Sequence, residues 1–144
     1  MAEVEVTEEF NGSIEKVFAG ISKFELYPKY LPGVTGIKVN PPTVKGSHCR
    51  VRYEINIIKT FYYELNMFQE APERIWWDLQ DSNLMKINRG SWKFTPLGNG
   101  KTSGIYQVEL KFKGLVPSMI TDQVAKANLP LMMAGFKRMI SDQS

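Results

Sequence analysis

The sequence predicts an α+β domain in which a curved antiparallel sheet of about seven strands is covered by one long C-terminal helix. Residues 49–112 alternate between apolar and polar types, which is typical of strands with one buried face. Turn residues separate these segments, and Gly98-Asn99-Gly100 is the clearest hairpin signal. After Gly114 the apolar spacing becomes helical. A chain of 144 residues therefore predicts one domain over residues 1–144.

The N-terminal third predicts one strand and two short helices. Val4 and Val6 alternate with glutamates, which favours a strand, and Ser13 can cap a helix over residues 14–21. Two prolines four residues apart between positions 24 and 33 limit the next segment to a short helix or turn. Residues 37–39 are then expected to be extended.

The central strands place aromatic residues on one face of the sheet. The connection at residues 58–60 lacks glycine, proline and asparagine, and we expect a turn there because the strands on either side are both amphipathic. By alternation, the inner face carries Tyr53, Tyr63, Met67, Trp77, Trp92, Phe94, Tyr106 and Val108.

The C-terminal segment predicts a helix of roughly 23 residues, which would be about 35 Å long. Pro117 suits its first turn, and Pro130 should kink it near Lys126. Its apolar stripe runs through Ile120, Val124, Ala127 and Leu131. A helix of this length can cover the dry face of the sheet.

The inward side chains suggest a binding cavity. Buried tyrosine and tryptophan need partners for their polar ends, and such residues around a concave sheet are typical of an apolar pocket with a few polar contacts. The alternative is an ordinary packed core. The candidate ligand-binding residues are Tyr53, Tyr63, Met67, Trp77, Trp92, Phe94, Tyr106, Val108, Ile120, Val124 and Leu131.

Three segments resemble a known superfamily in the same order along nearly the whole chain. They are residues 17–34, with Tyr27-Pro28 and Leu31-Pro32-Gly33; residues 90–102, with Gly90-Ser91-Trp92-Lys93-Phe94; and the closing helix. The chain resembles the START-like (SRPBCC) helix-grip superfamily, in its branch of polyketide cyclases, dehydrases and coenzyme-Q-binding proteins.

The resemblance implies the element order β-α-α-β6-α and a cavity between the sheet and the last helix. It implies binding of a lipid, quinone or polyketide-like molecule by a carrier or sensor. A cyclase/dehydrase-like enzyme and a ribosome- or complex-associated module stay open as alternatives. Gating segments are expected at residues 27–36 and 114–119.

Catalytic machinery is sparse in the sequence. The single histidine, His48, and the single cysteine, Cys49, are neighbours on opposite strand faces, so they do not form a catalytic pair. No phosphate-binding loop, dinucleotide-binding motif or nucleophile elbow is present. We expect no metal and no cofactor. An enzyme would have to rely on pocket tyrosines, whose ordinary pKa of about 10 makes them poor bases at neutral pH.

The charge pattern limits the expected partners. A net charge of +3 without basic blocks argues against DNA binding, and no apolar run reaches the length of a membrane span. The N-terminus has no signal-peptide pattern, so a cytoplasmic protein is expected. The surface hypotheses are a weak homodimer through Trp76 and Ile105, and a basic face for the ribosome formed by Lys111, Lys113, Lys126, Lys137 and Arg138.

Overall fold

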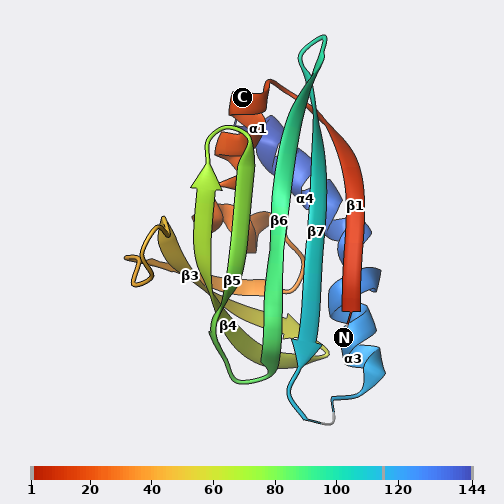
Figure 1. Ribbon diagram of the computed structural model, residues 1–144. Helices are drawn as coiled ribbons and strands as arrows, with labels where there is room; N and C mark the ends of the chain where they lie inside the picture. Colours follow the sequence, from red (N-terminus) through yellow and green to blue (C-terminus); the bar gives the residue numbers. More distant parts are fainter. Residues whose placement is uncertain (1, 115, 144) are drawn as a thin grey trace.

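The computed structural model of the chain describes residues 2–114 and 116–143 (Figure 1). Its strands form one antiparallel sheet in the order β1-β7-β6-β5-β4-β3-β2, so that the first strand pairs with the last. The α+β fold class is confirmed. The strands are β1 (Ala2–Asn11), β2 (Val34–Asn40), β3 (Cys49–Ile57), β4 (Lys59–Glu70), β5 (Arg74–Ser82), β6 (Met85–Gly98) and β7 (Lys101–Phe112).

Two short helices follow β1 as predicted. Helix α1 (Ile14–Ile21) begins after Ser13, whose side-chain oxygen accepts a hydrogen bond of 3.2 Å from the Lys16 amide. A 3-10 turn, η1 (Phe24–Leu26), leads into α2 (Tyr27–Tyr30), which has a proline in its first turn. The expected turn between β3 and β4 is confirmed at Ile58, whose φ of 67° is rare for a β-branched residue.

The C-terminal helix is not one regular α-helix. It consists of α3 (Ser118–Asp122), the π-helical turn η2 (Gln123–Ala127) and α4 (Leu129–Asp142). The Asn128 amide donates to the Gln123 carbonyl, five residues back, at 3.2 Å. Pro130 lies in the first turn of α4, where the missing amide proton costs least. The predicted disturbance before Pro130 is confirmed, and its form is a π turn with one extra residue.

Helix α4 crosses the concave side of the sheet, and Figure 1 shows it behind β6 and β7. It also packs closely on α2. A Cβ atom at Gly135 would lie 2.4 Å from the Tyr30 carbonyl oxygen, so only glycine permits this approach. Beside it, the Tyr30 hydroxyl donates to Asp142 at 2.6 Å.

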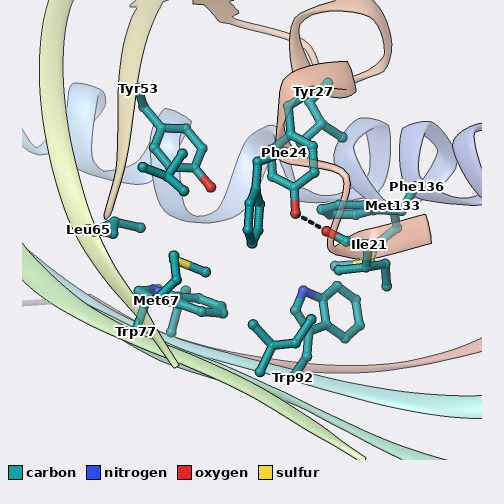
Figure 2. Packing of buried hydrophobic residues seen from close by; sticks show 14 of the residues in the cluster. Ile21, Phe24, Tyr27, Tyr53, Leu65, Met67, Trp77, Trp92, Met133 and Phe136 are labelled. Atoms are coloured by element: carbon teal, nitrogen blue, oxygen red, sulfur yellow. Dashed lines mark hydrogen bonds between the residues drawn. The ribbon is translucent and has the colours of Figure 1, made fainter. Parts of the chain in front are cut away.

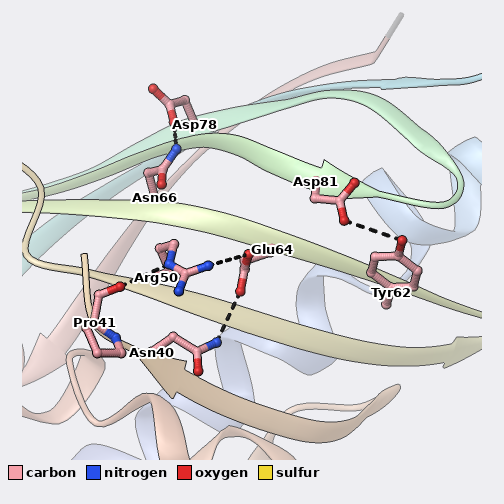
Figure 3. Close-up of polar contacts among 8 residues, drawn as sticks. All are labelled: Asn40, Pro41, Arg50, Tyr62, Glu64, Asn66, Asp78 and Asp81. Atoms are coloured by element: carbon pink, nitrogen blue, oxygen red, sulfur yellow. Dashed lines mark hydrogen bonds and ion pairs between the residues drawn. The ribbon is translucent and has the colours of Figure 1, made fainter. Parts of the chain in front are cut away.

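A polar network ties β2, β3, β4 and β5 together on the convex face (Figure 3). The Glu64 carboxylate, which is nearly buried, accepts hydrogen bonds from Arg50 at 3.2 Å and Asn40 at 3.1 Å. Asn66, also buried, donates to Asp78 at 2.8 Å. These contacts supply partners for the buried Glu64 carboxylate and the Asn66 amide nitrogen.

The sheet is incompletely paired between β5 and β6. Only Arg74–Trp77 pair with residues 90–93, while the rest of β5 pairs with β4 and the rest of β6 pairs with β7. The indole of Trp77 lies against Gly90 at this divergence, where an added Cβ would come within 2.7 Å of the ring. Strands β5 and β6 therefore separate next to the Trp77 ring, which lies on the concave face of the sheet.

Candidate functional site

A cavity of about 120 Å³ lies between the concave face of the sheet and the helices. Its walls come from α1, η1, α2, strands β2 to β7, and the C-terminal helical segments. Apolar and aromatic side chains dominate the lining. In Figure 2 the Tyr53 hydroxyl points toward the space between Phe24, Met67 and Trp77. The geometry is that of a mainly apolar site between a sheet and a helix.

Most of the residues predicted from alternation border this cavity. The residues among them that line it are Tyr53, Tyr63, Met67, Trp77, Trp92, Tyr106, Val108 and Val124. The strand residues of this set were predicted correctly because side chains alternate along a strand, and one face of each strand is directed toward the helix. Contact with a ligand stays a prediction for every one of them.

Two of the predicted residues are buried but lie outside the cavity lining. Phe94 stacks on Trp92, with ring centroids 5.6 Å apart, and meets the edge of Phe18 at 6.2 Å. It therefore packs between the sheet and α1. Ile120 is buried at the start of the C-terminal helix without reaching the cavity.

Leu131 points away from the cavity, with 61% of its surface exposed. Its predicted position assumed regular α-helical spacing from Ile120. The π turn inserts one extra residue, which shifts the inward face of the following helix. The lining residues are instead Val124, Asn128 and Met132, at steps of four.

Asn88 is a cavity residue that the sequence analysis missed. Its Oδ1 accepts a 3.1 Å hydrogen bond from the Trp77 indole, and its Nδ2 faces the Met85 sulfur at 3.8 Å. Alternation backwards from Trp92 through Gly90 would have placed Asn88 inward, so a signal was present. Several lining residues between α1 and β2 were also missed, because this segment of short helices and turns gives no clear period. They are Phe24, Tyr27, Leu31 and Pro32.

Four tyrosines in the lining differ in how their hydroxyls are used. The Tyr27 hydroxyl donates to the Ile21 carbonyl at 2.6 Å. The hydroxyls of Tyr53, Tyr63 and Tyr106 make no hydrogen bond to any described residue. The rings of Tyr53 and Tyr63 stack at 4.7 Å across β3 and β4. The cavity wall thus carries three hydroxyls whose hydrogen-bonding capacity is unused by the protein.

Burial raises the pKa of these phenols. Desolvation is the largest cause of the raised pKa of Tyr53, Tyr63 and Tyr106, and the same holds for Tyr27. Because ionisation is disfavoured, the phenols are protonated at neutral pH and act as hydrogen-bond donors.

Ionisable groups other than tyrosine are absent from the lining formed by the described residues. Across residues 2–114 and 116–143, no group of three or more His, Cys, Asp or Glu side chains is placed to hold a metal ion. Cys49 is buried, and burial raises the pKa of its thiol, which keeps it neutral. Among the described residues, none of the helices combines the length and the hydropathy that a membrane span requires.

The basic residues of the predicted surface patch are partly engaged inside the molecule. Lys113 donates to the Ser82 carbonyl at 2.8 Å, Lys137 pairs with Glu8, and Arg138 reaches the Tyr30 carbonyl at 3.4 Å. On the outer face, Trp76 stacks on Phe68 and lies under Arg74. Association through these surfaces stays a prediction.

Solved structures share this fold over the whole chain. A START superfamily protein from Mycobacterium smegmatis is 20% identical with a TM-score of 0.83, and 99% of each chain is covered. A protein from Thermus thermophilus is 16% identical with a TM-score of 0.84, again over 99% of each chain. The Zhui aromatase/cyclase from a Streptomyces species is 10% identical with a TM-score of 0.83, over 99% of this chain and 94% of that one.

At these identities the structural likeness shows the fold alone. No curated protein sequence matches the chain. The sequence profile described as "Polyketide cyclase / dehydrase and lipid transport" matches residues 1–142. Because this match spans almost the entire sequence, the chain belongs to the polyketide cyclase/dehydrase and lipid transport family.

Proposed function

We propose that the protein binds a small hydrophobic molecule in the cavity between the sheet and the C-terminal helix, and acts as its carrier or sensor. The observation that carries this proposal is the cavity itself, a space with mainly apolar walls next to the hydrophobic core. A core selected for stability alone would fill this volume, because empty space forfeits packing contacts.

Binding is better supported than catalysis by the chemistry of the lining. A cyclase or dehydrase needs a group that removes a proton, and the raised pKa of Tyr53, Tyr63 and Tyr106 keeps these phenols protonated at neutral pH. Protonated phenols can still orient a carbonyl group. Orienting a carbonyl group contributes to ligand binding and does not require a chemical reaction.

The proposal is tested by mass spectrometry of an organic extract from natively purified protein. The control is the variant Val124→Phe, which places a large ring at the helical wall of the cavity. Circular dichroism and thermal unfolding establish that the variant is folded. We expect one apolar compound in stoichiometric amount with the wild-type protein and its depletion in the variant.

An empty protein requires a second experiment with added compounds. Small apolar molecules with one ring are titrated into the wild-type protein and the Val124→Phe variant, and binding is followed by heteronuclear NMR. If no compound co-purifies and none of the added compounds shifts the resonances of cavity residues, the binding function is refuted.

A further inference from the structure

Three tyrosines with unpartnered hydroxyls line the cavity. Tyr53 and Tyr63 lie opposite each other in the register of β3 and β4. Tyr106 comes from β7, and its ring lies 6.0 Å from Trp77 and 5.1 Å from Trp92. These tyrosines therefore reach the cavity from separate parts of the sheet.

The phenol groups are close enough to influence one another. Ionisation of Tyr53 is opposed first by burial and then by Tyr27, Tyr63 and Tyr106, each of which raises its pKa. Tyr63 is affected by Tyr106 in the same way. All three phenols belong to the lining of the same cavity and are protonated there.

Three other polar groups of the lining already have partners. Asn88 accepts from the Trp77 indole, and Asn128 donates to the Pro32 carbonyl at 3.2 Å. The Tyr27 hydroxyl donates to Ile21. The unused donors of the described lining are consequently the indole N–H of Trp92 and the hydroxyls of Tyr53, Tyr63 and Tyr106. A buried donor normally finds a partner.

The electrostatic character of the cavity excludes a charged occupant. Within the described part of the chain, no Lys, Arg or His side chain lines the cavity to compensate an anion. Transfer of an unpaired carboxylate into such an environment is strongly unfavourable. A neutral oxygen acceptor, in contrast, can take hydrogen bonds from the phenols.

The size of the cavity limits the occupant further. Its volume of about 120 Å³ is comparable to an engineered apolar cavity of about 150 Å³ that binds benzene. A molecule on the scale of a single ring fits without rearrangement of the walls.

We propose that the cavity is specific for a neutral, ring-sized ligand that carries a carbonyl or ether oxygen, and that Tyr53, Tyr63 and Tyr106 bind this oxygen. The inference rests on the proposed binding function and assigns its ligand class. The tyrosine hydroxyls are the specificity-determining groups, and the aromatic walls supply the remaining contact area.

Three probes of similar shape test this assignment: acetophenone, which has a neutral carbonyl; ethylbenzene, which has no oxygen; and benzoate, which is an anion. Each is titrated into the wild-type protein and into Tyr53→Phe, Tyr63→Phe and Tyr106→Phe. The matched control is Tyr62→Phe, because Tyr62 lies on the outer face under Arg52 and its hydroxyl faces Asp81 at 3.4 Å. Binding is measured by calorimetry and NMR.

We expect at least one cavity variant to lose about 3- to 10-fold in affinity for acetophenone, as for loss of one hydrogen bond. Its affinity for ethylbenzene should be unchanged or higher, which also shows that its cavity is folded. Tyr62→Phe should behave as the wild-type protein. Benzoate should bind at least about 100-fold more weakly than acetophenone, because its charge has no counterion.

The outcomes separate this inference from the function on which it rests. If neither neutral probe binds the wild-type protein, both the binding function and the ligand class are refuted. If acetophenone and ethylbenzene bind the wild-type protein and all the cavity variants equally well, the binding function stands and the role of the hydroxyls is overturned. Binding of benzoate at the affinity of acetophenone overturns the requirement for neutrality.

Discussion

At the scale of single residues, the cavity tyrosines combine two properties that are rarely found together. Tyr53 is almost fully buried, yet its hydroxyl has no partner among the described residues. Tyr63 and Tyr106 keep some accessible surface while burial raises their pKa. The accessible surface of Tyr63 and Tyr106 is compatible with their raised pKa because both residues line the cavity.

The raised pKa of these tyrosines predicts a loss of stability at alkaline pH. In the unfolded chain a tyrosine ionises near pH 10, whereas the folded protein retains the proton to higher pH. Above about pH 10 the unfolded state therefore binds fewer protons, and the free energy of unfolding falls as pH rises. Each buried tyrosine contributes up to about 1.4 kcal/mol per pH unit.

Urea unfolding at several pH values between about 9 and 11 measures this effect. Tyr53→Phe removes one titrating group, so its stability should fall less steeply with pH than that of the wild-type protein. Equal slopes for the two proteins would show that Tyr53 does not retain its proton in the folded state.

At the scale of elements, the strands were predictable and the phase of the last helix was not. A strand has a period of two, so Tyr53 and Tyr63 could be placed inward from their neighbours alone. Pro130 predicted a disturbance of the helix, but no pattern in the sequence marked the extra residue of the π turn. For this reason the sequence pointed to Leu131, and the structure places Met132 in the wall.

Polar residues in the wall were also hard to predict. A search for apolar alternation passes over Asn88, although it occupies an inward position of β6 and receives the Trp77 indole proton. Asn128 follows the π turn, so its inward direction depends on that turn. Asn88 could therefore have been found by counting back from Trp92 in β6, whereas Asn128 could not be placed before the π turn was known.

The hydrogen bond from Asn128 to Pro32 joins the C-terminal helix to the segment after α2, and both residues line the cavity. Asn128→Ala removes this bond, and we expect faster hydrogen exchange in residues 30–34 and a faster rate of ligand entry. Lys126→Ala is the matched control, since Lys126 is exposed on the same helical turn. Unchanged exchange and entry rates in Asn128→Ala would rule out this contact as part of a gate.

At the scale of the whole molecule, the sheet curves around the helix, with β1 and β2 at its two edges. The pairing of β1 with β7 joins distant parts of the chain, and neither the alternation nor the element order predicted it. A larger side chain in the cavity would gain packing contacts and so raise the free energy of unfolding. The same side chain would take up space that a ligand needs and so lower the affinity for it.

The variant Val108→Ile tests whether filling the cavity raises stability and lowers ligand affinity. Val108 is buried and lines the cavity, so an added methylene should increase the free energy of unfolding by about 0.5–1.5 kcal/mol and weaken binding of small apolar ligands. Val51→Ile is the control, because Val51 is fully buried outside the cavity and should be destabilised by overpacking. Unfolding in urea measures both effects, and a less stable Val108→Ile protein would show that the space is not available.

The arrangement of the tryptophans gives the protein an intrinsic optical signal. Trp77 and Trp92 line the cavity, whereas Trp76 lies on the opposite face of the sheet against Phe68. Indole emission depends on the polarity of its surroundings, so an occupant that displaces water changes the emission of the two inner tryptophans and leaves that of Trp76 constant. Trp76→Phe would then remove the invariant background, and the fluorescence of the remaining pair would report the occupancy of the cavity without an added dye.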